Sequence, residues 1–224
     1  MSVVLAFDCA VSGLGVAVVH DGKPLARLHE AGRDQAARLL PAIKAVLEQA
    51  AIARRDVSLI AVTVGPGSFT GVRVGLAAAR GLAVGLGAPL AGFATTSVLL
   101  AQARASDRLV VAAIDSHLGD WFCALESDQA PFVATADSLA PHLQGQSCMV
   151  IGSAVASLAA GLEVRGLQAL PEEAVPDPVV LARLAAEDGE EAWRVRNNAE
   201  GLPRPLYLRG VNITLPDGAR RTVE

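Results

Sequence analysis

The chain has 224 residues, 52% of them apolar, so it can bury a sizeable core as one large domain or as two small ones. Its formal net charge of −4 at pH 7 gives no overall electrostatic footprint for nucleic acid, so any contact with RNA would need positive charge from a partner. The three cysteines lie far apart with no Cys-x-x-Cys pair, which argues against structural zinc and favours buried, reduced thiols.

No targeting or membrane segment is expected. The N-terminal residues MSVVLAFDCA lack the basic stretch and the long apolar run of a signal peptide. No stretch of about 18 apolar residues is free of charges and turn residues. We therefore expect a cytoplasmic protein with no membrane partner.

The first half of the chain predicts three strands followed by alternating helices and strands. The strands of the meander are expected at residues 3–7, 15–19 and 25–29, with Asp21-Gly22 as a hairpin turn. A helix over about 33–51, a strand over 57–64, a helix ending near residue 86, a strand over 89–93 and a helix over 95–104 follow. This βββαβαβα order is that of the ribonuclease-H-like core shared by actin, sugar kinases and heat-shock ATPases.

The same pattern starts again, more weakly, after residues 105–108. A strand over 109–114 ends at Asp115 as the first strand ends at Asp8; strands over 121–126 and 132–135 and helices over 138–143, 153–160 and 179–187 follow. We predict a duplicated ribonuclease-H-like α/β fold with two lobes, each a mixed sheet flanked by helices. Residues 1–105 form the first lobe, and residues 106–224 form a degraded second lobe with an extended tail.

The most informative segment is GPGSFTGVRVGLAAAR, residues 65–80. Its glycines allow backbone torsions or close approaches that a Cβ would block, and Ser68 or Thr70 can cap the helix that follows. The first N–H groups of that helix favour an anion or an acidic partner. It is not a Walker loop, because no Lys-Ser or Lys-Thr follows the last glycine. The motif-loop residues are Gly65, Pro66, Gly67, Ser68, Phe69, Thr70, Gly71 and Arg73.

Two helices of the first half are apolar over more of their surface than a sheet requires. The helix over 33–51 carries two neighbouring apolar stripes, and the second is either buried within its own domain or meets another chain. The next helix has a ridge of small residues at four-residue steps that allows close helix packing, against its own sheet or against a partner. The candidate interface residues are Leu39, Ala42, Ile43, Val46, Gly71, Gly75, Ala78, Ala79 and Leu82.

These residues resemble the TsaB (YeaZ) family, required to make threonylcarbamoyladenosine in bacterial tRNA. The similarity covers most of the chain and is strongest in VLAFDCAVSGLGVAVV, in RLLP (38–41), in AVTVGPGSFTGVRVGLAAARGLA, in AAIDSHLGD (112–120) and in the C-terminal PLYLR. One departure is Gln35, which stands where many family members carry histidine.

The resemblance implies a non-catalytic subunit with no cofactor of its own. Its partner would be a TsaD-like transferase acting on adenosine next to the anticodon of ANN-decoding tRNAs. A TsaE-like ATPase would join the complex, and tRNA would be contacted through it. A homodimer could form through the same apolar surface.

The chain itself shows little of a catalytic centre. The two metal-binding histidines of the TsaD-like partner align with Thr95 and Leu99, and leucine cannot coordinate a metal. No HExxH stands anywhere, and the four histidines have no ligand spacing. Asp8 and Asp115 are either an acidic pair able to hold magnesium in one cleft or ordinary hydrogen-bonding groups at strand ends.

Two other functions stay open. A small-molecule kinase or ATPase of the actin-like fold is indicated by Asp8, Asp115 and the helix N-terminus after Gly71. A direct tRNA contact is indicated by basic residues of the tail, although a solvated tail explains them as well: Arg204, Arg209, Arg220 and Arg221.

Overall fold

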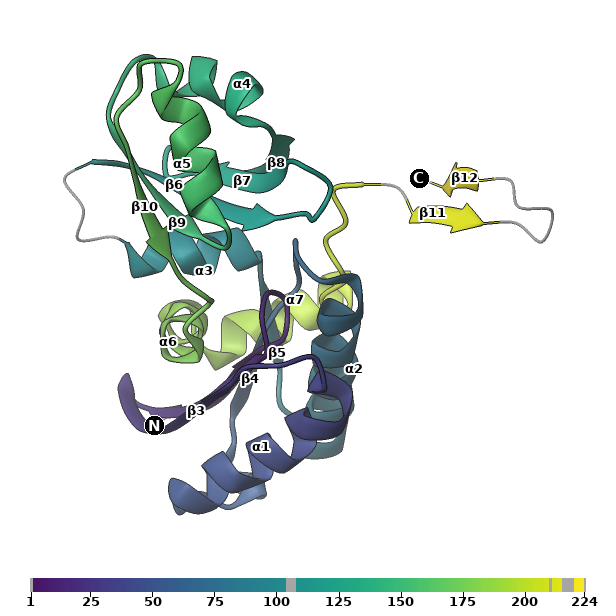
Figure 1. The fold of residues 1–224 in the computed structure, drawn as a ribbon. Helices are drawn as coiled ribbons and strands as arrows, with labels where there is room; N and C mark the ends of the chain where they lie inside the picture. The colour runs from purple at the N-terminus through teal and green to yellow at the C-terminus, as the bar shows by residue number, and fades with distance from the viewer. Residues whose placement is uncertain (1, 104–107, 210, 215–219, 224) are drawn as a thin grey trace.

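The computed structural model describes residues 2–103, 108–209, 211–214 and 220–223, and from residue 211 onward only the backbone (Figure 1). The first half forms a five-stranded sheet in the order β3-β2-β1-β4-β5. The meander β1 (Val3–Asp8), β2 (Leu14–His20) and β3 (Lys23–Glu30) is antiparallel, and β4 (Leu59–Thr63) and β5 (Leu90–Phe93) join it in parallel. Asp21 and Gly22 both have positive φ, as the expected hairpin turn requires.

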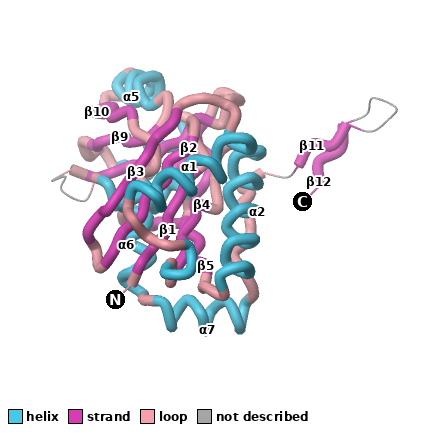
Figure 2. Tube along the Cα trace, turned by 90° about the horizontal axis from the view of Figure 1, so that it is seen from below, coloured by secondary structure: helices cyan, strands magenta, loops and turns pink. Residues whose placement is uncertain are grey.

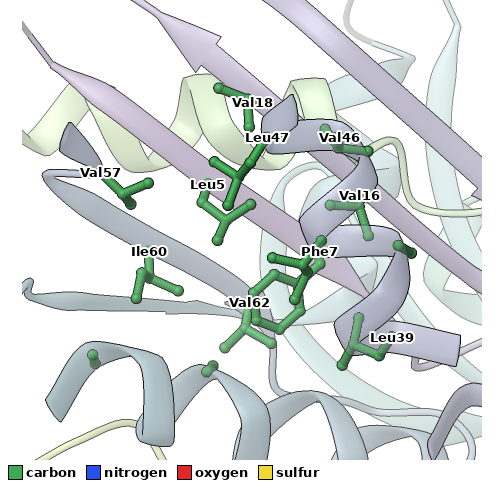
Figure 3. Packing of buried hydrophobic residues seen from close by; sticks show 14 of the residues in the cluster. Leu5, Phe7, Val16, Val18, Leu39, Val46, Leu47, Val57, Ile60 and Val62 are labelled. Atoms are coloured by element: carbon green, nitrogen blue, oxygen red, sulfur yellow. The ribbon is translucent and has the colours of Figure 1, made fainter. Parts of the chain in front are cut away.

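One face of this sheet carries α1 (Gln35–Gln49) and α2 (Phe69–Leu86), which contact each other; a 3₁₀ turn, Arg54–Asp56, precedes β4 (Figures 1 and 2). Leu39, Val46 and Leu47 of α1 enter the same apolar cluster as Phe7 and the other inward residues of β1, β2 and β4 (Figure 3). Every residue of β1 is buried, because both faces of this central strand are covered.

The second sheet repeats the topology of the first. Its order is β10-β9-β6-β7-β8, so β6, β7 and β8 correspond to β1, β2 and β3, and β9 and β10 to β4 and β5. The strands are β6 (Leu109–Asp115), β7 (Trp121–Leu125), β8 (Asp128–Ala134), β9 (Cys148–Gly152) and β10 (Ala169–Glu173). Helices α4 (Ala136–Leu139) and α5 (Val155–Glu163) pack beside it, with a 3₁₀ turn at Ala140–Leu143. The duplicated ribonuclease-H-like fold is confirmed.

Helices α3 (Thr95–Gln102) and α6 (Pro178–Asp188) lie between the two sheets and contact each other (Figure 1). α6 packs on β1, β2 and β4, and Trp193 of α7 (Glu190–Glu200) joins the same cluster. The two sheets thus fall on either side of residue 105, but two helices from the second half complete the first lobe. Their apolar residues cover the face of the first sheet that α1 and α2 leave open.

The sequence-based expectation missed four strands and one helix. These are β9, β10 and α7, together with β11 (Val211–Thr214) and β12 (Arg220–Val223), which form a separate two-stranded hairpin. α2 is long and apolar enough, by length and composition alone, to cross a membrane, with a mean hydropathy of 1.3. α2 contains Arg73 and Arg80, so the expectation that no such stretch is free of charges stands, and a helix packed against its own sheet passes the length-and-composition test as well.

Candidate functional site

A cleft of about 840 Å³ opens between the two lobes, at the carboxyl ends of the central strands. The loop after β1, the motif loop, the loop after β6 and the start of α5 all contribute to its walls. Its polar lining includes Ser12, Ser68, Thr70, Asp115, Ser116, His117 and Ser153, with Arg33 and the buried Gln35 at the α1 side. This is the position at which an open α/β sheet places a ligand.

The motif loop docks the start of α2 directly on the backbone of the loop after β1. Ser68 is the N-cap: its Oγ accepts from the Gly71 N–H at 3.2 Å, and its own N–H donates to the Ala10 carbonyl at 2.6 Å. A Cβ on Gly71 would lie less than 3.0 Å from the Cys9 carbonyl oxygen, and one on Gly67 would lie as close to the Ala10 carbonyl. The predicted cap by Ser68 is confirmed, and Thr70 lies inside the helix.

The rest of the motif contacts the chain near its C-terminal end, which the sequence did not indicate. The Leu206 N–H donates to the carbonyl oxygen of Val64 at 2.7 Å, directly before Gly65. Arg73 Nε donates to the Tyr207 hydroxyl at 2.8 Å, and the Arg73 guanidinium lies 3.4 Å from the centroid of the Phe69 ring. A second, smaller pocket of about 370 Å³ lies here, bounded among others by Pro66, Phe69, Leu118, Phe122 and Tyr207.

Asp8 is buried and does not line the cleft. Its Oδ1 accepts hydrogen bonds from Thr63 Oγ1 at 2.5 Å and from the Ala10 N–H at 3.0 Å. Burial raises the pKa of Asp8 from 3.8 to about 6, against the lowering effect of these two hydrogen bonds. Asp8 thus ties β1 to β4 and to its own loop, and the magnesium-holding pair with Asp115 does not form.

We expect the free energy of unfolding to fall as pH rises from about 4 to about 6, because folded Asp8 keeps its proton where the unfolded chain has lost it. The stabilisation by protonated Asp8 is complete below pH 3.8, which is the pKa of Asp8 in the unfolded chain, and is lost once pH passes about 6. At 1.36 kcal/mol per pKa unit, the loss is about 3 kcal/mol. Asp8→Asn keeps an acceptor oxygen but cannot ionise, so the difference in urea stability between variant and wild type should change by most of this amount between pH 4 and 7. A difference independent of pH would contradict the assignment.

Asp115 does line the cleft, but its carboxylate is engaged. Oδ1 accepts from the His117 N–H at 2.8 Å, and Oδ2 lies 3.0 Å from His117 Nδ1. The Asp115 N–H donates to Ser153 Oγ. Among the described residues, no group of three or more His, Cys, Asp or Glu side chains is placed to hold a metal ion.

The second helix start in the cleft is occupied by a carboxylate of the chain itself. Glu173, at the end of β10, accepts from the N–H groups of Ala154 and Ala156 at the start of α5. A helix N-terminus favours an anion, and here the Glu173 carboxylate already accepts hydrogen bonds from two of the N–H groups at this helix start.

The three cysteines are buried, free thiols, as expected. Burial, with the nearby Asp8 charge, raises the pKa of Cys9 to about 12; burial, with Asp120, does the same for Cys123, and burial also raises the pKa of Cys148. They stay protonated and unreactive near neutral pH.

The candidate interface residues need correction. Seven of the nine are buried in the core of the first lobe: Leu39, Ala42, Ile43, Val46, Gly71, Gly75 and Ala79. Ala78 and Leu82 are partly buried against the same core. Residues from both apolar stripes of α1 are buried, among them Leu39 and Ile43, although Leu40 of the first stripe is exposed; the buried residues therefore stabilise the lobe.

A different surface of the same two helices is exposed; we call it the helix-pair face. Its apolar residues mostly have small side chains. They are Leu40, Pro41 and Ala45 on α1, and Ala77, Gly81, Val84 and Gly85 on α2. Val84 is 76% exposed and Leu40 57%. An added Cβ at Gly81 or Gly85 would meet no atom within 4 Å.

The basic tail is only partly described. Arg209 pairs with Asp120 of the second lobe, and Arg204 is exposed. The side chains of Arg220 and Arg221 lie outside the described residues. The direct tRNA contact stays a prediction.

The sequence and the fold are both similar to those of known proteins. Residues 29–141 match the family model "TsaD: tRNA N6-adenosine threonylcarbamoyltransferase". The "tRNA threonylcarbamoyladenosine biosynthesis protein TsaB" of Escherichia coli (strain K12) is 34% identical over 123 residues, 54% of this chain and 53% of that protein. The chain therefore spans about half the length of the curated relatives it matches.

Solved structures extend the similarity over nearly the whole chain. "An uncharacterized protein with similarity to peptidase YEAZ from Pseudomonas aeruginosa" aligns with a TM-score of 0.73 at 27% identity, over 93% of this chain and 100% of that chain. A ROK hexokinase from Thermus thermophilus, with a TM-score of 0.50 and 11% identity over 83% of this chain and 97% of its own, shares the fold alone.

Proposed function

The chain belongs to the TsaB (YeaZ) family, and on this basis we propose that it is a non-catalytic subunit in the synthesis of N6-threonylcarbamoyladenosine in tRNA. In this role it docks and stabilises a TsaD-like transferase, which modifies the adenosine next to the anticodon of ANN-decoding tRNAs. The observation that carries the proposal is the match of residues 29–141 to a transferase family model. The resemblance implies that the metal-binding histidines of such a transferase correspond here to Thr95 and Leu99.

The packing of α3 supports a non-catalytic role. Thr95 and Leu99 are both fully buried, and Leu99 belongs to the apolar cluster between α3 and the second sheet. These two positions therefore contribute to the packing between the lobes, and neither faces the interlobe cleft.

The helix-pair face is the docking surface we propose. The matched residues 29–141 contain both helices, so the transferase carries a homologous pair. Two homologous surfaces can meet about a pseudo-two-fold axis as a four-helix contact, and small residues such as Ala77 and Gly81 allow the close approach that this needs. The same geometry would serve a homodimer when the transferase is absent.

Reconstitution tests this function. We expect the purified chain alone to transfer no threonylcarbamoyl group to an ANN-decoding tRNA transcript, because its metal-ligand positions lack ligands. A TsaD-like transferase supplied with threonylcarbamoyl-AMP and a TsaE-like ATPase should form the modified adenosine only when the chain is added, as measured by nucleoside mass spectrometry. Transfer by the chain alone, or equal product without it, would contradict the proposal.

A kinase or ATPase of the actin-like fold is the second candidate, favoured by the 840 Å³ cleft and its hydroxyl lining. Against it, Glu173 occupies the start of α5 and Asp8 is buried away from the cleft. Calorimetry with magnesium-ATP on the isolated chain separates the two functions, because only the second requires heat of binding and turnover.

The remaining parts of the proposal follow from the family. We propose a cytoplasmic complex in which a TsaE-like ATPase joins the chain and its transferase. Contact with tRNA is made mainly through the complex, since the net charge of −4 gives the chain no overall positive charge to attract RNA.

A further inference from the structure

The segment 202–209, which we call the C-terminal strap, lies along α2 and the motif loop. Leu202 and Leu206 pack against the first core, and the Leu206 N–H bonds to the Val64 carbonyl at 2.7 Å. Gly92 has no room for a side chain, because a Cβ there would come within 3.0 Å of Pro203. The strap is therefore fitted into the first lobe at several points.

Two arginines of α2 bind this strap. Arg80 donates through Nε and Nη2 to the Pro203 carbonyl, at 3.2 and 2.6 Å. Arg73, two turns earlier, bonds to the Tyr207 hydroxyl, and its guanidinium lies beside the contacting rings of Phe69 and Tyr207, 3.4 and 5.6 Å from their centroids. Both contacts lie on one side of the helix, since seven residues separate them.

The far end of the strap is held by the other lobe. Arg209 pairs with Asp120, in the loop between β6 and β7, and its guanidinium lies 5.9 Å from the centroid of the Phe122 ring. The strap thus spans both lobes and is anchored at each end.

α2 buries two larger side chains, Val72 and Leu76, both in its first half. The other four residues that it buries are Gly71, Gly75, Ala79 and Ala83. Side chains this small interlock little with their neighbours, so they do not by themselves fix the rotation of the helix or its position along its axis.

We propose that the C-terminal strap positions α2 through the Tyr207–Arg73 and Pro203–Arg80 hydrogen bonds. The helix-pair face is then already in the arrangement that binds the partner. The docking part of this inference rests on the proposed function. A surface held in its bound arrangement before contact loses less entropy on binding, so the strap acts on affinity without touching the partner.

The test compares Tyr207→Ala with Tyr207→Phe, which loses the hydroxyl but keeps the ring beside Arg73. We expect Tyr207→Ala to weaken calorimetric affinity for the TsaD-like transferase about tenfold and Tyr207→Phe less than about threefold. Arg73→Ala combined with Tyr207→Ala should be no weaker than either alone, because the two side chains act as one unit. Leu170→Ala, at a residue 43% exposed on the second sheet, is the matched control for Tyr207, which is 41% exposed.

Hydrogen exchange separates the strap from the proposed function. Tyr207→Ala should speed exchange of amides in the first half of α2 about tenfold and leave those of α5 and the second sheet unchanged. If wild type does not bind the transferase, the proposed function fails and this measurement alone decides whether the strap holds α2. Unchanged exchange in α2, or faster exchange throughout both lobes, would overturn the inference, as would full affinity in Tyr207→Ala.

Discussion

Replacing Gly71 with alanine is expected to lower the free energy of unfolding by about 3 kcal/mol. The added Cβ would lie less than 3.0 Å from the Cys9 carbonyl oxygen, a backbone atom directly after the central strand. That strand is buried on both faces and cannot move, so the start of α2 must lift away from it. The Ser68 cap and the packing of Val72 and Leu76 would be disturbed with it. Urea unfolding followed by circular dichroism measures the loss.

The same substitution at Gly81 is the matched control, with the opposite sign. Gly81 lies in the interior of the same helix, but an added Cβ there meets no atom within 4 Å. Alanine is the better helix former by about 1 kcal/mol, so Gly81→Ala should stabilise the chain by up to that amount. Equal effects at the two positions would show that Gly71 is not in close contact with the loop after β1.

These two glycines show which features of the motif the sequence could predict and which it could not. The motif predicted a glycine-dependent approach and a capped helix, and both are confirmed. The spacing of the glycines in the sequence could not identify the atoms that they approach. The Cys9–Ala10 backbone lies beside them only because β1 pairs with β4. The strap was missed for the same reason, since its hydrogen bonds to α2 join residues more than 120 positions apart.

The misassigned interface has a related cause. Periodicity identifies apolar stripes but does not say which stripe meets the sheet, and on α1 Leu39 and Ile43 from neighbouring stripes are both in the core. On α2 the exposed face consists of residues such as Ala77 and Gly81, whose small size gives a weak hydrophobic signal. The strongest apolar pattern therefore marked the inside of the lobe.

In the second half, the missed elements lack the usual patterns. β9 is a short apolar run without alternation, and β10 contains Pro171 and two glutamates, which only an edge strand tolerates. α7 buries a single side chain, Trp193, so it has no apolar stripe to detect. The repeated topology was still predictable, because β6 ends at Asp115 as β1 ends at Asp8.

Gly81→Arg is expected to weaken binding to the TsaD-like transferase at least about 100-fold while the chain stays folded. The position is open to solvent in the isolated chain, and arginine is a better helix former than glycine, so the fold should tolerate it. In the docked state the side chain would place bulk and an unpaired charge where two helices approach closely, which costs several kcal/mol. Changes at the buried Gly75 or Ala79 would instead test the fold, because both lie in the core.

Val164→Arg is the control for this prediction. Val164 is 84% exposed at the end of α5, in the second lobe, so the variant adds the same charge away from the helix-pair face. Calorimetric titration of the transferase with each variant, alongside melting curves, separates binding from folding. Because the structure leaves Gly81 unpacked within the chain, loss of affinity without loss of stability requires that another molecule covers this position. If both variants bind like wild type, the docking surface lies elsewhere on the chain.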